Sequence, residues 1–375
     1  MRKNKFEKMN ELRHKIAQVV IMGIDGLTPQ KESKRLVERG VGGIILYTRN
    51  CSHPSQVAEL IRGLQEAARS KGWRIPLLVA IDQEHGRVTR IRKGLTLFPS
   101  PWNLGKMANT ALVRRVAQVT GRELALMGIN MNLAPVADIL LHPQNRVIGT
   151  RSFGNDPQLV AAMVAAYIKG LQGEGVAACA KHFPGHGATS KDSHRELPII
   201  ERSKRQLEDT ELVPFRMAVR TGVAAMMTGH LLFPDLDPQR PVTLSSTIIQ
   251  GLLRQRLGFK GVVICDDLKM GALSQWGDLE QRALEALKAG VDILLIGEGK
   301  VDGVLEALEK GVDRGEIPRS RAAEAVYRIL RLKERYPYKA SEDLKGLRRS
   351  EDLAFSERLF QGVKDEEGGP GNREI

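Results

Sequence analysis

The chain has 375 residues, enough for one large barrel or two medium-sized domains. Hydrophobic residues make up 42% of it, so it can bury a sizeable core, and global disorder is excluded. The formal net charge is +13, but lysine and arginine are interleaved with glutamate along the expected helices, and no RNP, zinc-finger or basic-zipper motif accompanies them. We therefore expect no nucleic-acid partner and a solvated basic surface that would help to attract an anionic substrate.

The cysteines and the apolar runs indicate the compartment. Cys51, Cys179 and Cys265 are scattered without CxxC spacing, which argues against a disulfide framework and favours a reducing environment. Residues 1–15 are densely charged, and no later apolar run approaches the roughly 18 residues that a membrane span needs. We expect a cytoplasmic monomer with no membrane contact.

Short apolar runs recur along the chain, with helical segments between them. In order, they are residues 19–21, 43–46, 77–81, 131–136, 177–180, 224–227, 262–264 and 293–296. Each run is almost continuously apolar, as expected of parallel strands that are buried on both faces. Eight strands alternating with helices predict a single-domain α/β fold, a (β/α)8 TIM-type barrel. A doubly wound open sheet is the alternative, although no glycine-rich dinucleotide loop is visible.

Residues 247–257 illustrate the helical segments between these strands. Their apolar side chains fall on one face, Ser245 or Ser246 can cap the start, and Gly258 can end the helix.

The character of the chain changes after Tyr338. Residues 341–364 predict one more amphipathic helix, whereas residues 365–375 are charged, rich in glycine and proline, and expected to be disordered. We therefore assign residues 1–340 to the barrel domain and residues 341–375 to a C-terminal extension.

Ionisable side chains follow five of the eight expected strands. They are Asp82 after the third, Asp138 after the fourth, Lys181 and His182 after the fifth, His230 after the sixth, and Asp266 and Asp267 after the seventh. Each alone has an ordinary explanation as a helix cap or a buried hydrogen-bond partner. Together they predict a catalytic site at the carboxyl ends of the strands, where barrel enzymes carry their chemistry.

Residues 181–194 form the densest cluster of such groups, with two lysines, three histidines and an aspartate. Side chains two residues apart in an extended loop point the same way, so Asp192 can meet His194. A carboxylate in that position fixes the tautomer of the imidazole and supports its charged form. Asp192 and His194 are therefore a candidate acid/base pair.

Three chemistries fit these residues. A metal-dependent barrel hydrolase could use His182, His186, His194 and Asp192 as zinc ligands, although their spacing is unlike the HxH pattern that is usual on the first strand of such barrels. In glycoside hydrolysis, Asp266 would attack the anomeric carbon and the Asp192–His194 pair would replace the second carboxylate. The third is a noncatalytic sugar-binding sensor, built on a barrel that has lost its catalytic activity. Such a protein normally loses the nucleophile or the acid first, whereas Asp266, Asp192 and His194 are all present.

Seven segments share a pattern with a known family. They are Gly42-Gly43-Ile44-Ile45-Leu46-Tyr47-x-Arg49-Asn50, Ile81-Asp82-Gln83-Glu84-x-Gly86-Arg87-Val88, Asn132-Leu133-Ala134-Pro135-Val136-Ala137-Asp138, Arg151-Ser152-Phe153-Gly154, Lys181-His182-Phe183-Pro184-Gly185-His186-Gly187, Asp192-Ser193-His194 and Cys265-Asp266-Asp267-Leu268. In combination they resemble glycoside hydrolase family 3, specifically its single-domain β-N-acetylglucosaminidase (β-hexosaminidase) branch. The resemblance runs from residue 16 to residue 336.

The resemblance implies a catalytic barrel that hydrolyses terminal β-linked N-acetylglucosamine with retention, through a covalent glycosyl-enzyme and without a cofactor or metal. The matching site residues are Asp266 as the nucleophile, His194 with Asp192 as the acid/base dyad, Asp82, Arg151, Lys181 and His182 as residues that hold sugar hydroxyls, and Arg90 and Met227 as further lining of the pocket. Asp267 is expected to be a structural neighbour, since adjacent residues at a strand end face opposite ways.

The same resemblance suggests partners and two departures. Cytoplasmic members of the branch act on muropeptide fragments, so N-acetylglucosamine-containing saccharides or muropeptides are the expected substrates. His85 stands where the family usually has glycine, which could alter the pocket rim. Ala188 replaces the aspartate that commonly follows Gly187. This change could loosen the loop that carries Asp192 and His194, which we call the dyad loop.

Overall fold

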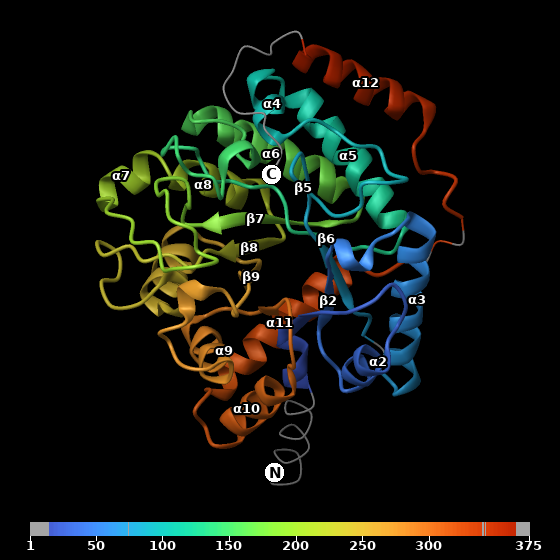
Figure 1. The fold of residues 1–375 in the computed structure, drawn as a ribbon. Helices are drawn as coiled ribbons and strands as arrows, with labels where there is room; N and C mark the ends of the chain where they lie inside the picture. The colour runs from blue at the N-terminus through green and yellow to red at the C-terminus, as the bar shows by residue number, and fades with distance from the viewer. Residues whose placement is uncertain (1–14, 74, 340, 342, 365–375) are drawn as a thin grey trace.

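The structure is a computed structural model that describes residues 15–73, 75–339, 341 and 343–364. Eight strands form one parallel sheet in the order β10-β1-β2-β3-β6-β7-β8-β9. They are β1 (Val20–Gly23), β2 (Gly43–Leu46), β3 (Leu78–Ile81), β6 (Met131–Asn132), β7 (Ala177–Phe183), β8 (Ala225–Thr228), β9 (Val262–Cys265) and β10 (Leu294–Ile296). A parallel bridge between Ile264 and Ile293 joins the two ends of the sheet. The predicted (β/α)8 barrel is confirmed, and the open doubly wound sheet is wrong (Figure 1).

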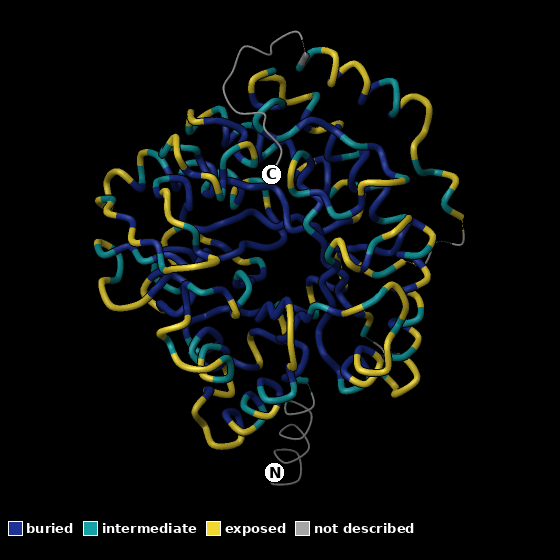
Figure 2. The backbone as a smooth tube through the Cα atoms, viewed as in Figure 1, coloured by how far each residue is buried: buried dark blue, intermediate teal, exposed yellow. Residues whose placement is uncertain are grey.

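Helices surround the strands on the outside. They are α2 (Lys31–Glu38), α3 (Pro54–Ser70), α4 (Pro101–Lys106), α5 (Thr110–Leu126), α6 (Pro157–Gly173), α7 (Lys204–Asp209), α8 (Leu212–Thr221), α9 (Leu279–Ala289), α10 (Asp302–Asp313) and α11 (Arg319–Arg335), with a π-helix, η5, at Thr247–Arg256. The strands are buried and the exposed residues lie on the outer helices and loops (Figure 2). This distribution explains why each strand reads as a nearly continuous apolar run.

The segment before β9 folds as a helix, as its pattern predicts. The hydroxyl of Ser245 accepts a hydrogen bond from Ile248 N at 3.1 Å, whereas the Ser246 side chain makes no capping bond. Gly258 follows the helix with a φ of 71°, a left-handed conformation that glycine adopts without steric cost. The helix is wound as a π-helix, a departure that the side-chain pattern does not reveal.

The fifth strand of the barrel is longer than its apolar run. β7 extends to Phe183 because Lys181 N donates to Pro135 O and Ala137 N donates to Lys181 O beyond the end of β6. Lys181 and His182 therefore lie within the last residues of the strand and not in the loop after it. The sheet thus fixes the backbone of these two residues.

A two-stranded hairpin follows β3 and was not apparent from the apolar pattern. It consists of β4 (Gln83–His85) and β5 (Val88–Thr89), paired antiparallel. The Gln83 side chain closes it, since its oxygen accepts from Arg90 N at 3.0 Å and from Ile91 N at 3.1 Å. The hairpin carries Glu84 beside the end of β3.

The last described element is α12 (Ser350–Lys364), which lies on the outside of the barrel beside α5 (Figure 1). Asp352 pairs with Arg122 of α5, with 2.5 Å between Oδ2 and Nη2. Residues 365–375, for which the sequence predicts disorder, lie outside the described residues. The division of the chain at residue 340 stays a prediction.

Candidate active site

A cavity of about 1410 Å³ opens at the carboxyl ends of the barrel strands. All nine residues that the sequence singles out as site residues line it: Asp82, Arg90, Arg151, Lys181, His182, Asp192, His194, Met227 and Asp266. They come from five of the eight strands or from the loops that follow them. The barrel thus brings together residues up to 184 positions apart, between Asp82 and Asp266; their individual roles stay predictions.

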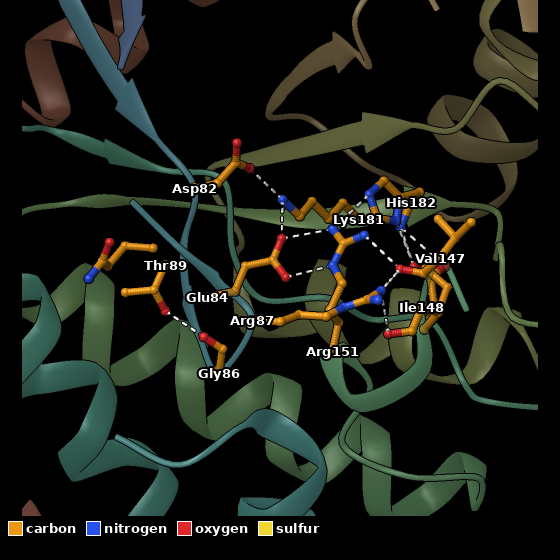
Figure 3. A network of polar contacts seen from close by, with 12 residues as sticks. Asp82, Glu84, Gly86, Arg87, Thr89, Val147, Ile148, Arg151, Lys181 and His182 are labelled. Atoms are coloured by element: carbon orange, nitrogen blue, oxygen red, sulfur yellow. Dashed lines mark hydrogen bonds and ion pairs between the residues drawn. The ribbon is translucent and has the colours of Figure 1, made fainter. Parts of the chain in front are cut away.

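Lys181 lies at the centre of a buried network of charges. Its Nζ is 2.7 Å from Asp82 Oδ1 and 2.6 Å from Glu84 Oε1. Glu84 also receives two hydrogen bonds from Arg151, at 2.7 Å from Nε and 2.8 Å from Nη2. Figure 3 shows the Lys181 ammonium between the two carboxylates, with the Arg151 guanidinium beside the carboxylate of Glu84. The second oxygen of Asp82 is 3.2 Å from Arg90 Nη2.

The network keeps Glu84 and Lys181 charged despite their burial. Burial acts against the charged form of Glu84, but Arg151 and Lys181 outweigh it and lower the pKa of this carboxyl. Burial likewise acts against the ammonium of Lys181, but Asp82 and Glu84 raise its pKa above the ordinary value. Opposite charges at this distance favour each other's ionised form. The result is a rigid set of donors and acceptors suited to hydroxyl groups.

His182 is oriented by the fully buried carboxylate of Asp138. His182 Nδ1 lies 2.7 Å from Asp138 Oδ2, and the same carboxylate accepts from the backbone N–H groups of His182 at 3.2 Å and of His186 at 2.7 Å. Burial acts against ionisation of Asp138, but His182 and these bonds lower its pKa. An ionised Asp138 requires a proton on His182 Nδ1. His182 Nε2 is thereby left to face Arg151 Nη2, 3.5 Å away.

Asp266 directly follows β9 and is the better ionised of two adjacent carboxylates. Burial acts to raise its pKa, but His182, His230 and the backbone N–H of Asp267, which donates to Asp266 Oδ1 at 2.9 Å, lower it overall. The pKa of Asp267 is instead raised, chiefly by burial. An ionised carboxylate at a strand end is what a nucleophile requires.

Asp267 is held by structural contacts. Its carboxylate accepts from Lys269 N at 3.0 Å, and its carbonyl oxygen lies 2.9 Å from His230 Nε2. His230 is itself held by the hydroxyl of Thr243, 2.8 Å from Nδ1. The contacts of Asp267 with Lys269 and His230 thus fix the turn that carries Asp266.

His194 and Asp192 meet as their spacing predicts. His194 Nδ1 lies 2.8 Å from Asp192 Oδ1, and the side chains are 65% and 39% exposed, respectively. Burial acts to raise the pKa of Asp192, but its bonds to the backbone and ring of His194 lower it. An ionised Asp192 places a proton on His194 Nδ1, so Nε2 is the nitrogen free to exchange a proton.

The backbone of the dyad loop is anchored next to the turn that follows Asp266. Gly271 N donates to His194 O at 3.0 Å, and Ala272 N donates to Ser193 O at 3.1 Å. The Ser193 hydroxyl lies 3.0 Å from His186 Nε2. The loop is therefore held close to the end of β9 while the His194 ring remains exposed.

The candidate zinc ligands have other partners. His182 is engaged by Asp138, His186 by Ser193 and His194 by Asp192. Burial lowers the pKa of His186 to about 4, as expected of a neutral core imidazole. Within the described part of the chain, no three or more histidine, cysteine, aspartate or glutamate side chains are grouped so as to hold a metal ion. This geometry gives the metal-hydrolase alternative no support.

Two residues of the site received no role from the sequence. Glu84 is the partner of both Lys181 and Arg151, and Asp138 orients His182. Glu84 stands two residues after Asp82, so strand alternation would have placed both carboxylates on one face. For Asp138, the sequence indicates only an ionisable residue after a strand.

The chain matches known proteins over most of its length. Residues 11–332 match the sequence profile described as "Glycosyl hydrolase family 3 N terminal domain". A beta-hexosaminidase of Nitrosomonas eutropha is 37% identical over 305 residues, which cover 78% of this chain and 86% of the relative.

No helix among the described residues is both long and apolar enough to cross a membrane.

Solved structures give the same relationship. A glycoside hydrolase family 3 beta-N-acetylglucosaminidase from Paenibacillus sp. superimposes with a TM-score of 0.88 at 40% identity, over 92% of this chain and 68% of that one. NagZ from Neisseria gonorrhoeae, in complex with N-trifluoroacetyl-D-glucosamine, gives a TM-score of 0.77 at 30% identity, over 92% of this chain and 97% of that one. The chain therefore belongs to glycosyl hydrolase family 3 and is a glycoside hydrolase similar to the beta-hexosaminidases of that family.

Proposed function

We propose that the protein is a retaining β-N-acetylglucosaminidase that forms a covalent glycosyl-enzyme on Asp266. The observation that carries the proposal is the position of Asp266 at the end of β9, in one cavity with the His194–Asp192 pair. The surrounding groups also lower the pKa of the Asp266 carboxyl, which favours its ionised form. An ionised carboxylate and a proton-carrying group on opposite sides of a glycosidic bond are the two parts that retaining hydrolysis needs.

In the first step, Asp266 attacks the anomeric carbon and the glycosidic C–O bond breaks. His194 Nε2 donates its proton to the leaving oxygen, while Asp192 holds the ring through Nδ1. In the second step, neutral His194 takes a proton from water, the water oxygen bonds to the anomeric carbon, and the ester to Asp266 breaks. Two inversions at one carbon give net retention.

The buried network is proposed to hold the sugar. Asp82 can accept hydrogen bonds from hydroxyl groups, and Arg151 can donate to hydroxyl oxygens. His182 Nε2 can accept from a hydroxyl group, because the proton of the ring is on Nδ1. Glu84 is proposed to fix Lys181 and Arg151 in place, since it contacts both. The names of the relatives support N-acetylglucosamine as the sugar, because they include a beta-N-acetylglucosaminidase and a complex with an N-acylated glucosamine.

Muropeptide fragments are the proposed source of that sugar. Exposed Arg87, Arg146, Arg195 and Lys269 line the mouth of the cavity. Muropeptides carry carboxylates, which such side chains attract.

The free thiols Cys51, Cys179 and Cys265 fit the reducing cytoplasm in which we propose that the enzyme acts.

Turnover of p-nitrophenyl β-N-acetylglucosaminide, compared with that of the corresponding glucoside, tests which sugar the enzyme prefers. We expect a far larger kcat/KM for the N-acetyl sugar and no effect of a chelator. NMR of the first product should show the β-anomer. Equal kcat/KM values for both sugars would overturn the N-acetyl preference, and an initial α-anomer would overturn retention.

A further inference from the structure

His85 stands in an unusual conformation next to the sugar site. Its φ is 71°, in the left-handed region that non-glycine residues rarely adopt. It directly follows Glu84 in β4, but it does not line the cavity and is only 2% exposed. A residue kept in such a conformation needs compensating contacts.

The first of these contacts is with α5. The hydroxyl of Thr120 donates its single proton to Val116 O at 2.8 Å, so it can only accept from His85 Nε2, 2.7 Å away. Burial lowers the pKa of His85 to about 4, and the ring is therefore neutral with its proton on Nε2. His85 thus ties the hairpin to the helix behind it.

The second contact leads to the C-terminal helix through two aromatic rings. The rings of His85 and Phe98 meet edge to face, with 5.2 Å between centroids. The ring centroid of Phe98 lies 5.7 Å from that of Phe355 in α12, and Cζ of Arg115 lies 4.4 Å from the centroid of the Phe355 ring. Phe355 is 4% exposed.

Hydrogen bonds connect the loop that carries Phe98 to α5 and to α12, and α5 to the segment just before α12. The buried carboxylate of Glu123 in α5 accepts from Thr96 N at 2.8 Å and from Arg348 N at 2.8 Å. The hydroxyl of Ser356 in α12 donates to Leu97 O at 2.5 Å. The loop that carries Phe98 is therefore fixed to both α5 and α12.

We propose that α12 braces the sugar site: Phe355 holds Phe98, Phe98 holds His85, and His85 holds the hairpin on which Glu84 meets Lys181 and Arg151. His85 and Phe355 are positioning residues in this proposal, because neither lines the cavity. The kinetic part of the proposal rests on the proposed function of the site.

Phe355→Ala in the full chain tests the brace, with Phe360→Ala as the matched control, since Phe360 lies on the same helix and is 40% exposed. We expect Phe355→Ala to raise the KM for p-nitrophenyl β-N-acetylglucosaminide by roughly three- to tenfold and to change kcat by less than about twofold, in line with the loss of one aromatic contact. His85→Ala should act in the same direction. Phe360→Ala should leave both constants unchanged.

Hydrogen exchange of the substrate-free protein gives a second readout. Backbone amides of residues 83–90 should exchange faster in Phe355→Ala than in the wild type and in Phe360→Ala, because the hairpin opens locally more often. If Phe355→Ala does not fold, Phe355→Leu keeps most of the buried volume and should show a smaller increase in the same segment.

A purely structural role for Phe355 would lower the melting temperature and leave KM unchanged. A folded Phe355→Ala or Phe355→Leu with wild-type KM and wild-type exchange in residues 83–90 overturns the brace. An inactive wild-type enzyme would instead overturn the proposed function, while the exchange measurement would still decide whether α12 supports the hairpin.

Discussion

Glu84 Oε1 lies 2.6 Å from Lys181 Nζ in the wall of the cavity, and the two side chains are only 1% and 2% exposed. Removing two charges from water is costly unless each finds close partners. Here Glu84 has Arg151 as a second partner and Lys181 has Asp82. Both charges thus have further partners within the protein, and these partners hold the side chains in the orientation that they present to a substrate.

Replacing Glu84 by glutamine should break this arrangement. Lys181 and Arg151 would lose a charged partner while still buried, and removing one member of a buried ion pair typically destabilises a protein by about 3–5 kcal/mol. We expect a fall of about 10² or more in kcat/KM, because the hydroxyl-binding groups would lose their orientation. Urea denaturation and steady-state kinetics measure the two effects.

The matched control is Glu196→Gln, since Glu196 pairs with Lys191 on the surface and both side chains are at least half exposed. Exposed ion pairs contribute little, so this variant should resemble the wild type. Wild-type kcat/KM in Glu84→Gln would show that the sugar site does not depend on the network.

The sequence predicts the barrel because its signal is local. Eight buried parallel strands produce eight apolar runs, and strand order follows chain order in this fold. The contact between Asp192 and His194 is also local, since it depends on a spacing of two residues. Both features were therefore accessible before the structure.

Long-range partners were not accessible in this way. The pairing of Glu84 with Lys181, 97 positions later, depends on the relative placement of β4 and β7. The extension of β7 through Lys181 arises from backbone bonds to Pro135 and Ala137, which no side-chain pattern encodes. The contact of Phe98 with Phe355 likewise depends on where α12 docks.

Replacing His194 by alanine should slow cleavage of poor leaving groups by about 10² to 10⁴, the usual contribution of general acid/base catalysis. Aryl glycosides with acidic phenols need little protonation, so their first step should be affected much less. Asp192→Ala should give a milder form of the same pattern, because the imidazole remains. Rate constants for a series of aryl leaving groups measure the dependence. A defect that is equal for all leaving groups would rule out proton donation by His194.

Lys333 of α11 should make stability depend on pH. Burial lowers its pKa to about 7, from an ordinary value of 10.5, and its ammonium has Gln18 Oε1 as a neutral partner at 2.6 Å. Between these two values the unfolded chain binds a proton that the folded protein does not. The free energy of unfolding should therefore rise with pH across this window, by up to about 1.4 kcal/mol per pH unit from this one group.

Lys333→Met removes this dependence. The stability of the variant relative to the wild type should be most favourable below pH 7 and should decline as the pH rises towards 10.5. The bond to Gln18 is also lost, but that cost does not vary with pH. Lys310→Met, at a side chain that is 63% exposed, is the control. A pH-independent difference between Lys333→Met and the wild type would show that Lys333 stays charged in the folded protein.

The most direct test of the mechanism is to trap the glycosyl-enzyme. Because an N-acetylglucosaminide carries its acetamido group at carbon 2, a 5-fluoro derivative of N-acetylglucosaminyl fluoride is the suitable slow substrate. Mass spectrometry of the peptides from the inactivated protein should find the sugar on Asp266, and Asp266→Asn should remain unlabelled and lose most activity, because an amide cannot form the ester. A sugar found on Asp267, or steady turnover without any labelled peptide, would contradict the assignment of Asp266 as the nucleophile.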